Sequence, residues 1–193
     1  MAKKESTFLN MVLTLFVVAL VASTALGFVY EATKGPIEIA KMEQKKAAIK
    51  EVVPEFNNAP LEMMKEIEKD GGKVVLYEAR KDSVLTGVAI ETFTNKGFSG
   101  FVKLMVGMTP EGNLYKISVL EQKETPGLGD KMVPSKSSFS SQFSGKNPSQ
   151  FKLKVKKDGG DVDAITAATI SSRAFCDAVN RAYQTFIEEY NKK

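Results

Sequence analysis

The first hydrophobic segment of the chain is also its longest. Residues 8–30 carry no charged side chain, and Lys3, Lys4 and Glu5 precede them. A helix rises about 1.5 Å per residue, so this segment is long enough to cross a hydrocarbon layer of roughly 30 Å. The pattern predicts a membrane anchor at 8–30 behind a short tip, 1–7, that stays in the cytoplasm.

A cleaved signal peptide is the alternative interpretation of the same segment. Ala25-Leu26-Gly27 would then be the small-residue cleavage site. We favour an anchor because the apolar run is longer than a usual signal core and continues past Gly27. Under either interpretation the bulk of the chain is exported.

The pattern changes to helical spacing after the apolar run. Residues 33–53 are rich in Lys and Glu, Gly35-Pro36 opens the segment and Pro54 closes it. This predicts a second helix, which we assign to a stalk that spans 31–70 together with a short helix at 61–68.

Alternating apolar and polar positions then predict a sheet. The expected strands cover residues 73–79, 84–93, 101–108, 114–120 and 151–155, with a hairpin turn at 110–113, a loop with one helical turn at 134–148 and a turn at 158–160. The expected fold class is α+β: one domain, 71–193, with a mostly antiparallel sheet and packed helices.

A strongly amphipathic helix ends the chain. Its apolar positions are Ala174, Phe175, Ala178, Val179, Ala182, Tyr183, Phe186 and Ile187, and charged or polar residues face the other way. This helix must begin around 170–172, which puts Thr169 in or beside its cap.

Composition excludes several kinds of chemistry. The chain has no His and one Cys, so imidazole metal sites, Ser-His-Asp and Cys-His nucleophiles and disulfides within the chain are ruled out. Cys176 flanks the apolar stripe of the last helix, which indicates packing, although a ligand shared with a neighbouring protein of a complex stays open. The lysines of 152–157 alternate with apolar residues, which indicates a solvated strand face and no nucleic-acid partner.

The start of the last helix carries the most informative motif. Asp163-Ala-Ile-Thr166-Ala167-Ala168-Thr169 runs into Ile170, Ser171 and Ser172. It resembles the covalent flavinylation motif of the RnfG family, which is related to the NqrC proteins of sodium-pumping quinone reductases. The match departs where Ala167 replaces the usual Gly and where Ile170 separates Thr169 from the serines. The alternative is that these hydroxyl residues only cap the helix.

The resemblance implies that Thr169 carries FMN through a phosphoester. Independently, the free N–H groups and positive dipole at a helix start favour a phosphate there. A separate flavin transferase would move FMN from FAD onto the Thr169 hydroxyl, with a magnesium ion at its own active site. Asp163 and Thr166 would shape this acceptor loop, whereas a solvent-facing turn is the competing role for Asp163.

Two further loops resemble the same family. Glu124-Thr125-Pro126-Gly127-Leu128-Gly129 follows a predicted strand, and its glycines would let the backbone approach a flat ring. Gly97-Phe98-Ser99-Gly100 is as consistent with a tight strand connection as with a flavin contact. The full set of expected cofactor-binding residues is Thr169, Asp163, Thr166, Ala167, Ala168, Ser171, Ser172, Glu124, Thr125, Gly127, Leu128, Gly129 and Ser99.

The resemblance implies an electron carrier of a membrane complex that couples ferredoxin–NAD redox chemistry to ion movement. Such a protein would not turn over NAD or ferredoxin itself but would relay electrons between other membrane subunits. The implied location is the bacterial inner membrane, single-pass, with the C-terminal domain on the periplasmic side. Many members of the family have a His just before the 124–129 loop, where this chain has Gln122. A protonation role of that His therefore does not carry over to this chain.

Two rival interpretations remain from the sequence. One is a flavin-bearing component of a related quinone reductase or extracellular electron-transfer system. The other is an anchored, non-redox scaffold with an empty motif, which only the departures at Ala167 and Ile170 favour. A hydrolase is disfavoured by the absence of histidine and of a paired-carboxylate signature.

Overall fold

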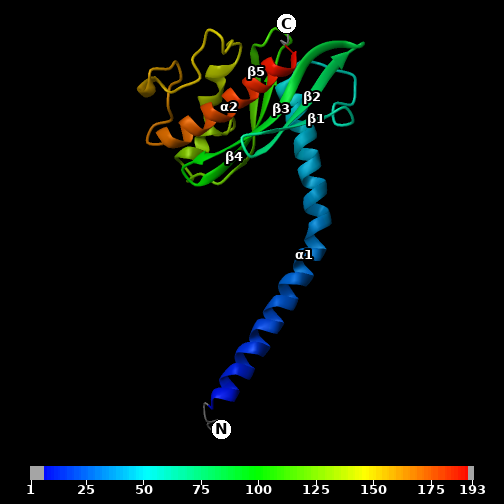
Figure 1. The fold of residues 1–193 in the computed structure, drawn as a ribbon, viewed down its shortest axis with the longest axis vertical. Helices are drawn as coiled ribbons and strands as arrows, with labels where there is room; N and C mark the ends of the chain where they lie inside the picture. Colours follow the sequence, from blue (N-terminus) through cyan, green and yellow to red (C-terminus); the bar gives the residue numbers. More distant parts are fainter. Residues whose placement is uncertain (1–6, 191–193) are drawn as a thin grey trace. The chain divides into compact units, whose positions relative to one another are not determined.

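The computed structural model describes residues 7–190, so the expected charged tip with Lys3, Lys4 and Glu5 lies outside the described residues. The elements are α1 (Phe8–Val52), β1 (Lys65–Lys69), β2 (Gly72–Lys81), β3 (Val84–Gly97), β4 (Gly100–Met108), β5 (Leu114–Gln122), the 3-10 turns η1 (Gly129–Met132), η2 (Phe139–Phe143) and η3 (Lys156–Asp158), and α2 (Thr169–Tyr190) (Figure 1). The chain divides into two compact units, one ending at Glu43 and the other beginning at Gln44.

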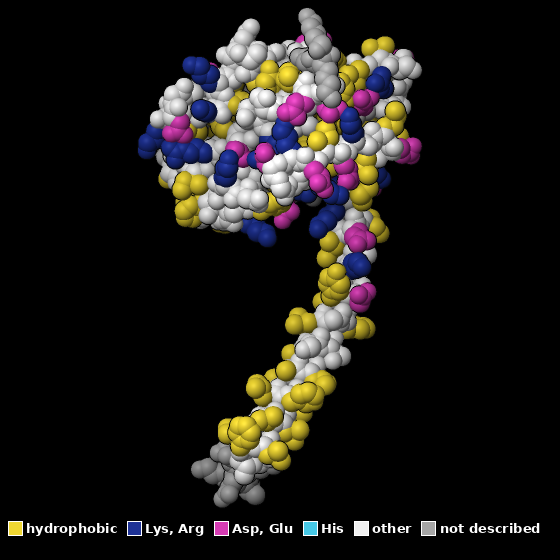
Figure 2. Space-filling model, viewed as in Figure 1, with side chains coloured by type: hydrophobic (Ala, Val, Ile, Leu, Met, Phe, Trp, Pro, Cys, Tyr) yellow, Lys and Arg dark blue, Asp and Glu magenta, His cyan; other side chains and the backbone are white. Residues whose placement is uncertain are grey.

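The first unit contains the apolar part of α1. This part is long and apolar enough to cross a membrane by length and composition, and it is not buried inside the structure. Phe8, Leu15 and Phe28 are more than two-thirds exposed. Figure 2 shows hydrophobic side chains along the visible face of this segment. Such an exposed apolar helix supports membrane anchoring.

The predicted break between anchor and stalk helix is wrong. Gly35-Pro36 does not open a new helix, because α1 is continuous from Phe8 to Val52 and contains Pro36 in its interior. A proline inside a helix removes one backbone hydrogen bond and crowds the carbonyl four residues earlier. The Ala-, Lys- and Glu-rich residues after it favour helix strongly enough for the helix to continue.

The second unit is built on a five-stranded antiparallel sheet in the order β1-β2-β3-β4-β5. This confirms the expected α+β class and four of the expected strands. The predicted helix at 61–68 is wrong, because Lys65–Lys69 pairs with β2 instead, from Lys65 opposite Leu76 to Lys69 opposite Gly72. Its alternation of charged residues around Ile67 suits an edge strand, and pairing with β2 overrides the local helical tendency.

The predicted strand at 151–155 is also wrong. This segment makes only an isolated bridge, between Val155 and Val162. The start of β5 is bonded instead to the loop that precedes residues 151–155. Leu114 N–H donates to Lys146 O at 2.9 Å, and Gly145 N–H donates to Leu114 O at 2.7 Å. The alternating pattern reflects burial, since Val155 lies fully in the core.

Both faces of the sheet are covered. On the α2 face, Phe175, Val179 and Phe186 pack on Leu104 and Val106 within the larger core. On the opposite face, which we call the α1 face, Ile49 and Val52 from the end of α1 pack on Tyr77 and Met105. The α2 face therefore positions the start of α2, where the main sequence motif lies.

Candidate functional site

Three segments far apart in the sequence meet at one cleft of about 300 Å³ beside the start of α2. They are the turn between β3 and β4, the 124–129 loop, and residues 167–171. The lining residues are Phe98, Glu124, Thr125, Leu128, Gly129, Ala167, Ala168, Thr169, Ile170 and Ser171. The structure thus brings together all three segments that resemble the flavin-binding family.

Thr169 is the first residue of α2 and is half-buried in the cleft wall. This confirms the expected start of the helix. The first N–H groups of any helix lack a partner within the helix. In α2 the N–H of Ser172 donates to Ala168 O at 3.0 Å and begins the helical series. The N–H groups of Thr169, Ile170 and Ser171 precede it, so the positive end of the helix lies at the Thr169 hydroxyl.

The side chain of Ser172 stabilises the backbone of the motif through two hydrogen bonds. Its buried hydroxyl donates to Ala168 O at 3.0 Å and accepts from Ile165 N–H at 2.9 Å. The residue does not line the cleft, whereas its neighbour Ser171 does. Ser172 therefore fixes the conformation of the acceptor loop.

Ala167 has a backbone φ of 59°, in the left-handed region. This is the position at which the flavinylation motif usually has Gly. A side chain in this region costs about 1 kcal/mol relative to glycine. The loop thus keeps the conformation that favours glycine even though this chain has alanine there.

The 124–129 loop uses its two glycines differently. Gly127 adopts φ of 77° in the turn, where the Leu128 N–H donates to Thr125 O at 3.1 Å. Gly129 is buried, and a Cβ added to it would lie 2.6 Å from Glu124 Oε2. One glycine allows the turn and the other allows close packing against Glu124.

Five of the thirteen expected residues, Ser172 among them, do not line the cleft. Asp163 is exposed and its carboxylate pairs with Lys156 at 2.7 Å, while Thr166 is exposed as well. Gly127 lies outside the lining, and Ser99 contributes its backbone N–H, which donates to Glu124 Oε1 at 2.9 Å. Asp163 and Thr166 are therefore accessible from solvent.

Two lining residues are missing from the expected cofactor-binding residues, although Phe98 lies in the turn that resembles the family and Ile170 lies in the motif. Phe98 is 67% exposed and Ile170 is 45% exposed, and Leu128 from the third segment is 40% exposed. We call these three side chains the apolar lip. The signal for Phe98 was a large apolar residue at the tip of a tight turn, and the signal for Ile170 was its position between Thr169 and the serines.

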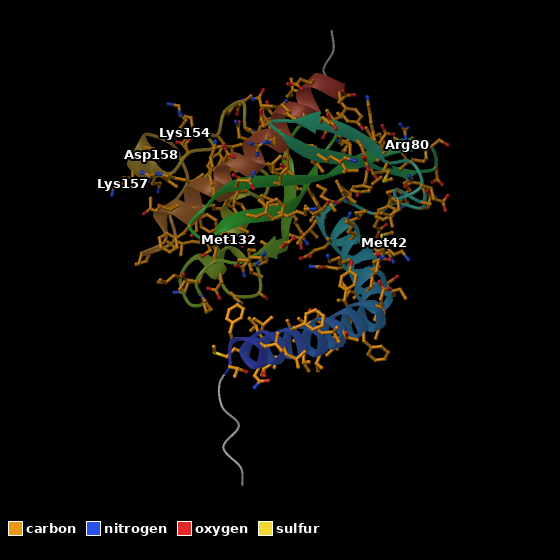
Figure 3. The ribbon with its side chains drawn as sticks, turned by 60° about the horizontal axis from the view of Figure 1, so that its bottom comes forward. Met42, Arg80, Met132, Lys154, Lys157 and Asp158 are labelled. Carbon is orange, nitrogen blue, oxygen red and sulfur yellow. The ribbon has the colours of Figure 1, made fainter. Side chains whose placement is uncertain are left out.

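A second, larger groove of about 520 Å³ adjoins the cleft at Ile170. Arg173 and Asp158 meet there in a two-pronged ion pair at 2.6 and 2.7 Å, and the hydrogen bond from Arg173 holds the pKa of Asp158 below its usual range. Figure 3 shows Lys154, Lys157 and Asp158 together on this side. These charges are exposed and partly compensate one another.

Cys176 also lines this groove but is 3% exposed. Burial raises the pKa of its thiol to about 12. A thiol reacts as the thiolate, so this environment lowers the reactivity of Cys176 and supports the packing role. Among the described residues, no group of three His, Cys, Asp or Glu side chains is arranged to hold a metal ion.

Comparison with known proteins supports the same region. A family model described as an FMN-binding domain matches residues 97–184. The G subunit of the ion-translocating oxidoreductase complex of Erwinia tasmaniensis is 37% identical over 87% of this chain and 84% of its own length. The proteins of the same name from Haemophilus influenzae strain PittEE and Pseudomonas aeruginosa strain PAO1 are 33% identical over 86% and 83%, and 32% identical over 96% and 91%.

The chain belongs to the RnfG family. Every residue that lines the cleft falls inside the matched FMN-binding domain. The end of α1, β1, β2 and most of β3 fall outside it, although they belong to the same compact unit.

The cleft of this RnfG family member suits FMN in its chemistry. The apolar lip offers surfaces for a flat aromatic ring, and the absence of a side chain at Gly129 leaves backbone close to the cleft. Thr169 offers a hydroxyl at a helix start, which stabilises a phosphate. The residues present therefore fit the cofactor that the family implies.

Proposed function

We propose that the chain is the electron carrier of a membrane-bound, ion-translocating oxidoreductase, with FMN held through a phosphoester to Thr169. One observation carries the proposal: the 124–129 loop and the 167–171 segment form walls of a single cleft, with Thr169 in one of them. The names of the relatives support the kind of complex, and the matched domain supports FMN.

Each part of the cleft has a role in this proposal. FMN, when bound, supplies one- and two-electron transfer, while the protein supplies placement and electrostatics. The Thr169 oxygen anchors the phosphate, and the N–H groups at the start of α2 stabilise its negative charge. The apolar lip holds the ring and excludes water from one side of it.

The attachment is a group transfer carried out by a separate flavin transferase. The Thr169 hydroxyl oxygen forms a bond to the phosphorus of the FMN half of FAD, the phosphoanhydride bond breaks, AMP leaves and the hydroxyl proton is released. A half-buried Thr169 in the wall of a cleft suits this reaction. Asp163 and Thr166 are exposed near it in the sequence, where a transferase can contact them.

The exposure of the apolar lip supports the relay role. A flavin held by partly exposed side chains keeps an edge open to a partner, which short electron-transfer distances need. We place the anchor at 8–30 and, on the periplasmic side of the inner membrane, the compact unit that begins at Gln44 and contains the matched FMN-binding domain. The electron donor and acceptor lie in other proteins of the complex.

The first test is covalent flavin in the full chain, co-expressed with a flavin transferase. In-gel fluorescence after denaturation and intact mass should show one FMN less one water. Thr169→Val should lose both signals while circular dichroism stays unchanged. Thr166→Val tests the neighbouring hydroxyl, and peptide mapping should still find the flavin on Thr169.

A fluorescent Thr169→Val protein would overturn the site assignment. A dark, unmodified wild-type protein, with the transferase active on a control acceptor, would favour a non-redox scaffold. If the flavin is attached, the acceptor that oxidises it in the purified complex distinguishes the two redox candidates. Oxidation by a quinone would favour a related quinone reductase over an Rnf-type relay.

A further inference from the structure

Glu124 lines the cleft and is buried although its side chain ends in a carboxyl group. It is 4% exposed, and it contacts all three segments that form the walls. Its Oε1 accepts from the backbone N–H of Ser99 at 2.9 Å. Its Oε2 accepts from the hydroxyl of Ser171. Each carboxylate oxygen therefore already has a protein donor from a different wall.

The backbone around Glu124 is shaped to receive this carboxylate. A Cβ added to Gly97 would lie 2.6 Å from Glu124 Oε1, and one added to Gly129 would lie 2.6 Å from Oε2. A side chain at either position would force the carboxylate to move. Two glycines on different segments thus leave room for the two oxygens of one carboxylate.

The entry to the loop is fixed as well. The Glu124 N–H donates to the side chain of Gln122 at 2.6 Å, which holds the backbone where β5 ends. Gln122 stands where the resembling family often has His. In this chain the side chain serves as an acceptor for the backbone of the 124–129 loop.

We propose that Glu124 is a positioning residue that joins the three walls of the cleft and does not itself bind the flavin. The β3–β4 turn, the 124–129 loop and the start of α2 are held in register by its two oxygens. This gives a physical reason for the presence of a carboxylate, two glycines and a serine in three separate segments. The inference deepens the proposed function and rests on it only for its effect on the cofactor.

The position of Glu124 also affects Thr169, the residue proposed to receive the flavin. Ser171 lies two residues after Thr169 on the first turn of α2, so the bond to Glu124 fixes that turn relative to the 124–129 loop. Without Glu124, the Ser99 N–H and the Ser171 hydroxyl lose a buried acceptor. The wall that holds Thr169 then separates from the loop.

The test is a double-mutant cycle in the full chain with Glu124→Ala, Ser171→Ala and both together. Glu124→Gln is the conservative variant, because an amide can accept from Ser99 N–H and donate to the Ser171 oxygen. Glu121→Ala removes an exposed carboxylate three residues earlier and is the matched control. Thermal unfolding without flavin, the flavinylation rate and the midpoint potential of the loaded protein are measured.

We expect Glu124→Ala to slow flavinylation at least tenfold, and Ser171→Ala to slow it several-fold. The double variant should be no slower than Glu124→Ala, because both changes break the same bond. Glu124→Gln should restore the rate to within about threefold of wild type, and Glu121→Ala should leave it unchanged. Loaded Glu124→Ala should also show a shifted potential, because its ring is held less rigidly.

Additive effects, or a Glu124→Ala protein that behaves as wild type, would overturn the inference. A Glu124→Gln protein as slow as Glu124→Ala would assign the effect to charge acting on the cofactor and would also overturn it. Failure of the proposed function looks different: the unfolding temperatures without flavin would still show the coupling between Glu124 and Ser171, but no variant and no wild-type protein would acquire FMN.

Discussion

Two glutamates of the same compact unit are equally buried and have different partners. Glu91 and Glu124 are each 4% exposed. Glu91 lies on the α1 face, where Lys103 and Lys45 contact its two oxygens at 2.9 and 3.0 Å and the Tyr77 hydroxyl donates to it at 3.1 Å. Glu124 lies in the cleft and accepts from a backbone N–H and a serine hydroxyl.

The difference shows how the same residue type serves two purposes. Lys45 belongs to the end of α1 and Lys103 to β4, so Glu91 joins helix to sheet through charge compensation. Glu124 joins three loops through neutral donors and brings no ammonium group against the place proposed for the flavin. Of these two glutamates, the one with ionic partners holds a helix to the sheet, and the one with neutral partners holds the walls of the cleft together.

The largest expected effect is on the α1 face. Glu91→Ala leaves two lysines and the Tyr77 hydroxyl without their common partner. The loss of one member of a buried ionic cluster costs about 3–5 kcal/mol, and because both lysine side chains are 32% exposed to water we expect the lower part of that range. Urea unfolding of the full chain in detergent measures the change.

The cleft should not respond to this substitution. Flavinylation per folded molecule of Glu91→Ala should match the wild type, because the partners of Glu91 are not cleft-lining residues. Lys81→Ala, which removes an exposed lysine paired with the exposed Glu55, is the control and should change stability little. A fall in flavinylation beyond the folded fraction would mean that the two regions are coupled.

The same cluster predicts a pH dependence. Burial raises the pKa of Glu91, but the hydrogen bonds and charges of Lys103 and Lys45 outweigh it and leave the pKa below its ordinary value. A carboxyl with a lowered folded pKa contributes stability above its unfolded pKa of about 4.3 and loses it as the pH falls through the folded pKa. The stability difference between wild type and Glu91→Gln should therefore be constant near neutral pH and shrink below about pH 4.3. A difference that grows on acidification would contradict the assignment.

A smaller effect is expected when the cleft is overpacked. Gly129→Ala places a methyl group against Glu124, and overpacking of this kind costs about 1–3 kcal/mol. Gly159→Ala is the matched control: it adds a methyl in open space at φ of 77°, so it tests backbone strain without a clash. Gly129→Ala should slow flavinylation and Gly159→Ala should not. Equal rates for the two variants would show that Gly129 is not needed for close packing.

The sequence predicted most of the architecture because its signals there are local. Alternation placed the strands from Gly72 to Gln122, and the stripe of α2 placed the last helix. The errors came where neighbours decide the outcome: β1 exists because β2 offers it an edge, whereas residues 151–155 make a single bridge and no ladder.

The cleft was predictable in its segments and not in its contacts. Motif resemblance singled out Thr169 and the 124–129 loop, and both line the cleft. The bond between Glu124 and Ser171 joins residues 47 positions apart, and no pattern along the chain reveals such a pair. The turn of Phe98 was singled out by its resemblance to the family, but its alternative as a plain strand connection stayed open, because only folding brings the tip of this turn into the cleft wall.

The smallest effect is expected at Ala167, on the acceptor loop. Its φ of 59° favours glycine, whereas glycine also gives the unfolded chain more freedom, so the two terms largely offset. We expect Ala167→Gly to stabilise the protein by about 0.5 kcal/mol and to raise its melting temperature by about 1–2 °C. Ala174→Gly, in the buried interior of α2, should have the opposite sign, since glycine there costs about 1 kcal/mol. If both substitutions destabilise the protein to the same extent, the left-handed conformation of Ala167 does not store strain, and the departure from the flavinylation motif at this position has no energetic consequence for the loop.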